Sequence, residues 1–89
     1  MNKPNITPTP WHIEECVSHI AVSRKGWPRD AWMVATLGHQ RHDPANAQFI
    51  AAAPQMAETL EKMLWAKPED FPRLQAEARA ALLAAGYTE

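Results

Sequence analysis

The chain has 89 residues, which is enough for one domain and no more. Its apolar fraction of 46% and charged fraction of 21% are those of a folded globular protein, so disorder over the whole length is excluded. The net charge of −1 argues against a nucleic-acid-binding domain, which is usually clearly basic. Because the chain has a single cysteine, Cys16, and no long apolar run, we expect a soluble cytoplasmic protein without a leader or membrane span.

The first half of the chain favours strands. Residues 1–10 contain three prolines and are predicted to form an extended arm ahead of one domain at 11–89. "WHIEE" alternates in polarity, while "CVSHIAVS" and "AWMVATL" are rich in residues that favour strands. "RKGWPRD", with Gly26 and Pro28, is the clearest turn. We therefore predict a three-stranded antiparallel sheet over residues 11–37.

The second half favours helices. Asp43 is predicted to cap a helix that has Pro44 at its first position. Pro54 is expected to end that helix or kink it sharply and open a second segment, because proline disfavours a helix interior. The second segment carries one apolar face, which we expect to point into the core. Its residues are Met56, Ala57, Leu60, Met63 and Leu64.

A last helix is predicted over residues 71–85, after punctuation by Pro68 and Pro72, with Gly86 as its C-cap. Its many alanines permit close packing of another helix. That packing is equally consistent with a homodimer through this helix and with an intramolecular hairpin. Trp65 is expected to fill the core or a subunit contact.

The predicted fold is therefore α+β, with a small three-stranded antiparallel sheet followed by two to three helices, from residue 44 to 85, packed on one face. The predicted core is apolar residues from both halves: Trp11, Ile13, Ile20, Val22, Trp32, Val34, Phe49, Ile50, Met56, Leu60, Leu64, Leu74 and Leu82.

Two segments, "TPTPWHIE" and "NAQFIAAAPQMAETLEKML", together resemble a family of short, uncharacterised accessory proteins of tailed phages and prophages. Its members open with Thr-Pro-Gly-Pro-Trp, pass through a few strands and carry an Asn-Ala-x-Leu-Ile-Ala-Ala-Ala-Pro-Glu-Leu-Leu helix. The first motif is matched, with Thr9 in place of Gly, by Thr7, Pro8, Pro10 and Trp11. The second is matched by Asn46, Ala47, Ile50, Ala51, Ala52, Ala53 and Pro54, with Phe49, Gln55 and Met56 replacing Leu, Glu and Leu.

This resemblance implies a mobile-element gene expressed inside a bacterium, and it carries over no catalytic residue. Small phage proteins often act by binding and blocking a host protein, immune nucleases included, which is an argument by analogy. We therefore expect a non-enzymatic protein without a cofactor, whose partner is a host protein.

The histidines raise a metal hypothesis, because His39 and His42 lie three residues apart beside Asp43. The paired cysteines of a structural zinc site are absent, and Asp43 is better used as a helix cap, so we expect no metal. Cys16 with His12 or His19 is the visible arrangement for nucleophilic catalysis, but no glycine-rich elbow accompanies it, so we expect no catalytic residue.

The basic turn "SRKGWPRD" is the predicted contact site, with Arg24, Lys25, Trp27 and Arg29 as its contact residues. Arg and Trp are enriched at interface hot spots. The plainer alternative is a solvated hairpin whose Trp27 folds back onto the sheet. The leading hypothesis for function is the binding, and plausible inhibition, of a bacterial defence factor, such as a CRISPR-type immune complex, or a replication factor. The alternative is a small nucleic-acid or nucleotide-binding module using the same turn, which the net charge disfavours.

Overall fold

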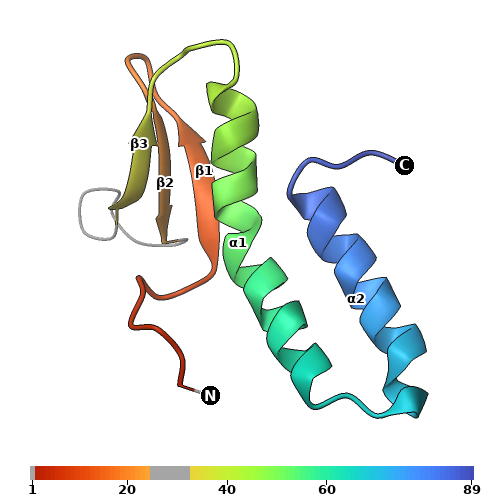
Figure 1. The fold of residues 1–89 in the computed structure, drawn as a ribbon. Helices are drawn as coiled ribbons and strands as arrows, with labels where there is room; N and C mark the ends of the chain where they lie inside the picture. The colour runs from red at the N-terminus through yellow and green to blue at the C-terminus, as the bar shows by residue number, and fades with distance from the viewer. Residues whose placement is uncertain (1, 25–32) are drawn as a thin grey trace.

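A computed structural model describes residues 2–24 and 33–89 and shows a sheet followed by a helical hairpin (Figure 1). The strands are β1 (Trp11–Glu15), β2 (Ile20–Arg24) and β3 (Met33–Leu37), in the antiparallel order β1-β2-β3. The helices are α1 (Asp43–Leu64), the short 3₁₀ helix η1 (Pro68–Asp70) and α2 (Phe71–Ala84). The predicted α+β class and the three-stranded antiparallel sheet are confirmed.

The second strand is shorter than predicted, because its first residues form the turn between β1 and β2. The Cys16 backbone N–H donates to the His19 carbonyl over 2.8 Å, and β2 begins only at Ile20. A tight reversal between adjacent antiparallel strands needs a few residues of its own. Since "CVSH" contains neither glycine nor proline, the turn left no mark in the sequence.

The core lies between the sheet and the first half of α1. Ile20 and Val22 of the central strand are buried against Ala47 of α1. Partly buried apolar residues surround them, including the predicted core residues Trp11, Val34 and Ile50; Trp32 lies outside the described residues. The burial of Ile20 and Val22 was predicted correctly, because a central strand is covered by α1 and by a strand on each side.

The prediction of two segments jointed at Pro54 is wrong: α1 is one helix of 22 residues with Pro54 inside it. Proline removes one backbone donor, the N–H that would bond the carbonyl four residues earlier. The flanking segments are rich in Ala, Leu, Glu and Met, which favour helix enough to continue through that defect. Pro54 lies in a hollow shared with the N-terminal arm, where its ring has neighbours to pack against.

The start of α1 also differs from the prediction, by one residue. His42 is the N-cap and Asp43 the first helical residue, so Pro44 is the second. The Asp43 carboxylate accepts a hydrogen bond from the backbone N–H of Gln40 over 2.9 Å. It therefore stabilises the turn before the helix, and its charge also favours the positive end of the helix dipole.

The predicted end of α2 is confirmed in detail. Gly86 has a φ of +106°, and its N–H donates to the Leu83 carbonyl, while the N–H of Tyr87 donates to that of Leu82. This pair of bonds is the Schellman motif, in which glycine is favoured because it adopts positive φ without a steric penalty.

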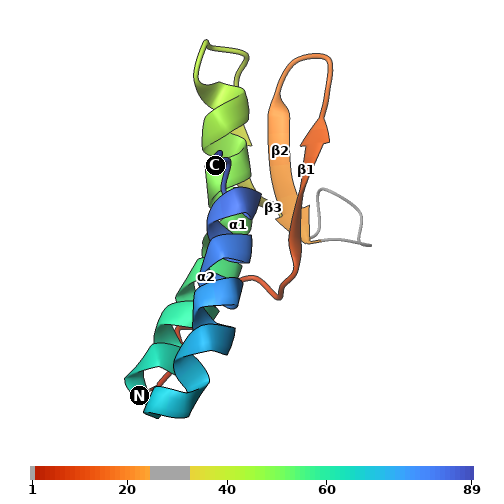
Figure 2. The same ribbon diagram turned by 90° about the vertical axis from the view of Figure 1, so that its right-hand side faces the viewer.

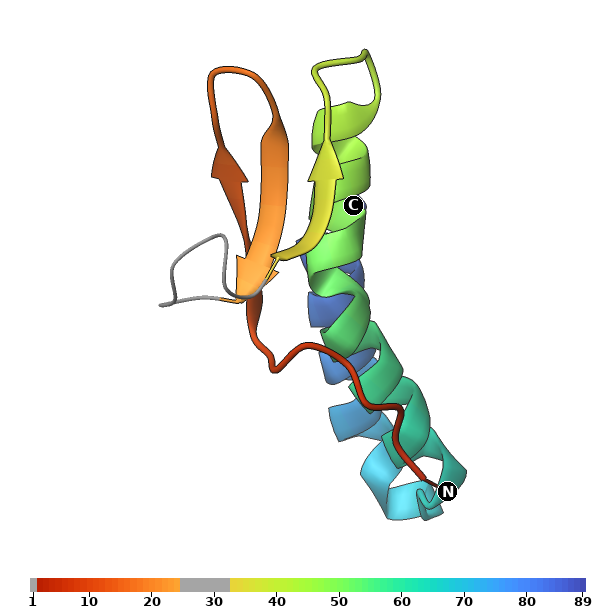
Figure 3. The same ribbon diagram turned by 90° about the vertical axis from the view of Figure 1, so that its left-hand side faces the viewer.

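Residues 2–10 run as an extended arm along the side of α1 (Figure 3). The Trp11 indole N–H donates to the Thr7 carbonyl over 3.0 Å, and Lys3 lies 4.0 Å from the Glu61 carboxylate. The arm therefore follows the part of α1 that extends beyond the sheet, although the long Lys3–Glu61 pair is exposed and contributes little.

Five of the predicted core residues are exposed instead: Ile13, Phe49, Leu60, Leu64 and Leu82. Four of them lie on the helical hairpin. Their exposure follows from how the two helices meet, because α2 packs along a line of α1 that runs beside the apolar face and leaves that face open.

Candidate functional site

Of the predicted contact turn, only Arg24 belongs to the described residues; Lys25, Trp27 and Arg29 lie outside them. Arg24 is the last residue of β2, half-buried, and stands opposite Trp11 in the register of the sheet. Arg24 therefore lies at the end of β2 from which the chain continues toward the predicted turn.

Two of the histidines make polar contacts near the turn between β1 and β2. The His39 Nε2 atom lies 3.2 Å from the Cys16 carbonyl, and the His19 Nδ1 atom lies 3.0 Å from the Ser18 hydroxyl. Within residues 2–24 and 33–89, no group of three or more His, Cys, Asp or Glu side chains could hold a metal ion. Among these residues, the structure brings no ligand set together around His39 and His42.

Two of the three residues weighed for nucleophilic catalysis, Cys16 and His12, contact backbone carbonyls. The Cys16 thiol lies 3.9 Å from the Glu14 carbonyl, and the His12 Nδ1 atom lies 3.2 Å from that of Ser23. These contacts hold each side chain against its own part of the β1–β2 hairpin. Such contacts orient a side chain in a sheet and do not by themselves activate a nucleophile.

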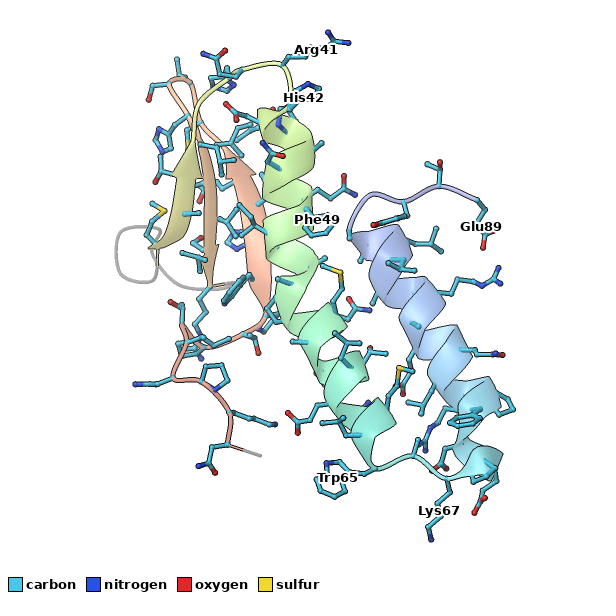
Figure 4. The ribbon with its side chains drawn as sticks, viewed as in Figure 1. Arg41, His42, Phe49, Trp65, Lys67 and Glu89 are labelled. Atoms are coloured by element: carbon cyan, nitrogen blue, oxygen red, sulfur yellow. The ribbon has the colours of Figure 1, made fainter. Side chains whose placement is uncertain are left out.

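Trp65 is 73% exposed, so of its two expected places the core is wrong, while a contact with another chain stays a prediction. It follows the last residue of α1, where its N–H bonds the Lys62 carbonyl, and its indole projects from the tip of the hairpin (Figure 4). Lys67, also exposed, follows two residues later. The exposed indole of Trp65 therefore offers a large apolar surface to solvent at the hairpin tip.

A second exposed surface, which we call the hairpin face, spans both helices. On α1 the positions 49, 53, 56, 60 and 63 are spaced by four and three residues, so they form one line along the helix. On α2 the positions 71, 78 and 82 also form one line. The exposed large residues of the hairpin face are Phe49, Leu60, Met63, Leu64, Phe71 and Leu82.

The line of α1 that contacts α2 lies one residue earlier. Lys62 of α1 pairs with Glu77 of α2 at 3.3 Å, and Thr59 borders the same hollow as that pair. Ala52 and Thr59 are buried, as is Ala81 of α2. The contact between the helices is therefore made largely by small side chains, and it forms the intramolecular hairpin that was one of the two expected packings. Ala81 of α2 is used in this contact, while Ala76, Ala80 and Ala84 stay exposed.

The two exposed lines lie on the same side of the hairpin. The helices are antiparallel, so a two-fold axis perpendicular to their common plane relates them, and equivalent positions fall on one face. Leu60 and Leu82 are equivalent in this sense, since each follows a buried contact residue, Thr59 or Ala81. The sheet contacts α1 through Ile50 and Ala51, on the other side. The hairpin face therefore looks away from the sheet, which lies on the far side of the helices (Figure 2).

A hollow of about 1000 Å³ runs along the outer side of α2 and the C-terminal residues. Arg79 lines this hollow and donates to the carboxylate of Glu89 over 2.6 Å. Both side chains of this ion pair are largely exposed, so the pair contributes little to stability. None of the helices in the described part of the chain is long and apolar enough to cross a membrane.

Residues 1–87 match a family model described as Salmonella phage P22 protein Y8K6. No curated protein and no solved structure matches the chain. The family match spans nearly the whole chain, including both segments that carried the resemblance to phage proteins.

Proposed function

Because the chain belongs to this phage family, we propose that it is a non-enzymatic accessory protein that binds a host protein. The proposed consequence is inhibition of a bacterial defence factor, such as a CRISPR-type immune complex, or of a replication factor. In this proposal the protein acts in the cytoplasm of the infected cell, where host proteins are the available targets. The phage family supports this setting, and the exposed residues of the hairpin tip support the proposed contact surface.

The observation that carries the proposal is the exposure of Trp65 at the hairpin tip. An indole that is 73% exposed gains little for the fold from its apolar area. Tryptophan is among the residue types most enriched at interface hot spots, where it fills a pocket of the partner. Trp65 therefore supplies the anchor that a small binding protein needs.

The predicted turn contributes the second set of contact residues, Arg24, Lys25, Trp27 and Arg29. In this proposal both tryptophans serve as anchors for protein contact, and the basic residues of the turn set orientation and specificity. If the turn instead grips phosphate, the chain is a nucleic-acid binder and its affinity falls steeply with added salt.

The test is capture from a lysate of the bacterial host with the tagged full chain, washed at moderate and high salt with nuclease present. Trp65→Ala is compared with Val17→Ala, which shortens an apolar side chain that is fully exposed. Both variants should unfold within about 0.5 kcal/mol of the wild type, because exposed substitutions rarely cost more. Trp65→Ala should weaken capture of a stoichiometric protein by about tenfold or more, and Val17→Ala should not.

Trp27→Ala with Arg29→Ala in one chain should also abolish capture without unfolding the domain. Equal capture by all variants would remove Trp65 and the turn from the contact surface. A partner that is lost with nuclease or salt would favour nucleic acid over protein as the target.

A further inference from the structure

The described monomer has a very small core for its length. Among residues 2–24 and 33–89, eight apolar residues are buried, and five of them are alanines. Ile20, Val22 and Leu74 are the only larger ones among these. A chain of this size buries a low fraction of its surface even when it packs well, and natural domains with small cores often gain stability by association.

Six large apolar residues that do not contribute to the core lie on the hairpin face. Its six large residues are between 41% and 65% exposed. If an apolar side chain of this size offers about 150–250 Å², the hairpin face offers about 500 Å². A patch of this size is in the upper part of the range, about 300–600 Å², of the largest apolar patch on a typical monomer, and such patches are often functional.

The spacing on α1 indicates that the occupant is helical. Positions 49, 53, 56, 60 and 63 carry Phe, Ala, Met, Leu and Met, spaced four, three, four and three residues apart. This is the a/d repeat of a helix that packs against another helix, sustained over two heptads. Since α2 packs on the neighbouring line of smaller residues, the line from Phe49 to Met63 remains exposed and has the spacing to pack against a further helix.

We infer that a second copy of this chain covers the hairpin face, so that the two helical hairpins form a four-helix bundle. The face is two helices wide, and the element that fills such a face is another two-helix layer, which an identical hairpin supplies through a two-fold axis. Two copies would bury about 1,000 Å², which reaches the lower bound for a specific interface. A second copy of the chain is also available wherever the protein is made, which a partner that completes the core requires.

This dimer leaves Trp65 available. Phe49 and Trp65 are sixteen residues apart, so they point about 160° away from each other around α1. In Figure 4 Phe49 lies at the side of α1 that faces α2, while Trp65 projects from the foot of the helix on the other side. The dimer therefore presents two copies of the proposed contact anchor, which adds avidity for a partner with two sites.

The test is the molar mass of the full chain by sedimentation equilibrium, over concentrations from nanomolar to high micromolar. The expected mass is 20.0 kDa, twice the chain mass of 10.0 kDa. Leu60→Lys and Leu82→Lys should each raise the dimer dissociation constant by about 100-fold. Leu83→Lys is the matched control: Leu83 is 43% exposed against 41% for Leu82, but it lies outside the hairpin face.

A mass of 10.0 kDa at every concentration would overturn the inference, and so would a dimer that is as tight in Leu60→Lys and Leu82→Lys as in the wild type. If the lysine variants unfold, Met63→Gln provides a milder change in the same seam. The midpoint of thermal unfolding of the wild type should then rise with protein concentration, and Met63→Gln should lower it at each concentration. A midpoint independent of concentration in the wild type would refute a dimer coupled to folding.

Discussion

Gly86 provides the sharpest test of how the helical hairpin is closed. Its φ of +106° lies in the region that residues with a side chain rarely adopt. Replacing it by alanine costs about 1–2 kcal/mol for the backbone conformation alone. The added Cβ atom would also lie 3.2 Å from the Oε1 atom of Gln48 on α1, so that amide has to shift slightly.

Gly86→Ala should therefore lower the free energy of unfolding by about 1–2 kcal/mol. For a domain of this size that corresponds to a fall in the thermal midpoint of about 4–16 °C. The measurement is urea and thermal unfolding followed by circular dichroism, at one fixed protein concentration so that association does not change the comparison.

Gly38→Ala is the matched control, because Gly38 has no positive φ and its added Cβ would lie at an ordinary 3.4 Å from the Asp43 carboxylate. Its stability should be unchanged or higher by up to about 1 kcal/mol, since alanine restricts the unfolded chain. Equal losses in the two variants, or no loss in Gly86→Ala, would contradict the role assigned to the Schellman motif.

Two further substitutions test the ends and the middle of the helices. Pro54→Ala should raise the free energy of unfolding by about 1–3 kcal/mol in a urea titration, because the N–H of alanine can donate to the Ile50 carbonyl in the interior of α1. A lower free energy of unfolding would mean that the packing of Pro54 beside the N-terminal arm outweighs the missing hydrogen bond. Asp70→Ala should lower it by about 1 kcal/mol, because the Asp70 carboxylate accepts the Lys67 N–H over 3.1 Å in a capping box. Asp70→Asn, which keeps an acceptor oxygen, should recover most of that stability, and equal losses in both would argue against the cap.

The elements with a local physical cause were predictable. Alternating and β-branched residues predicted three strands at nearly their observed positions, and Gly86 predicted the end of α2 because its requirement for positive φ is met within a few residues. Local rules failed where a neighbouring segment decides the outcome. The turn at 16–19 has neither glycine nor proline, and α1 passes through Pro54 because the rest of the helix favours continuation.

Only part of the candidate site could be predicted from the sequence. The basic turn could be recognised from its residue types, but its last residues lie outside the described part of the chain. Phe49, Leu60, Leu64 and Leu82 of the hairpin face were predicted as core and are exposed, although the lines of apolar residues were recognised correctly. Their meaning depends on which surface of each helix is covered, and residue type alone does not specify that.

The sequence by itself determined that the chain has three strands, that its second half is helical, and that one side of the long helix is apolar. Only the tertiary structure decided which side of α1 is covered. Close approach of two helices favours small side chains, so α2 packs along the line of Ala52 and Thr59 and leaves the bulkier line of Phe49, Leu60 and Met63 exposed. A hydrophobic stripe indicates that another element packs against the helix. Which element does so depends on how the whole chain folds.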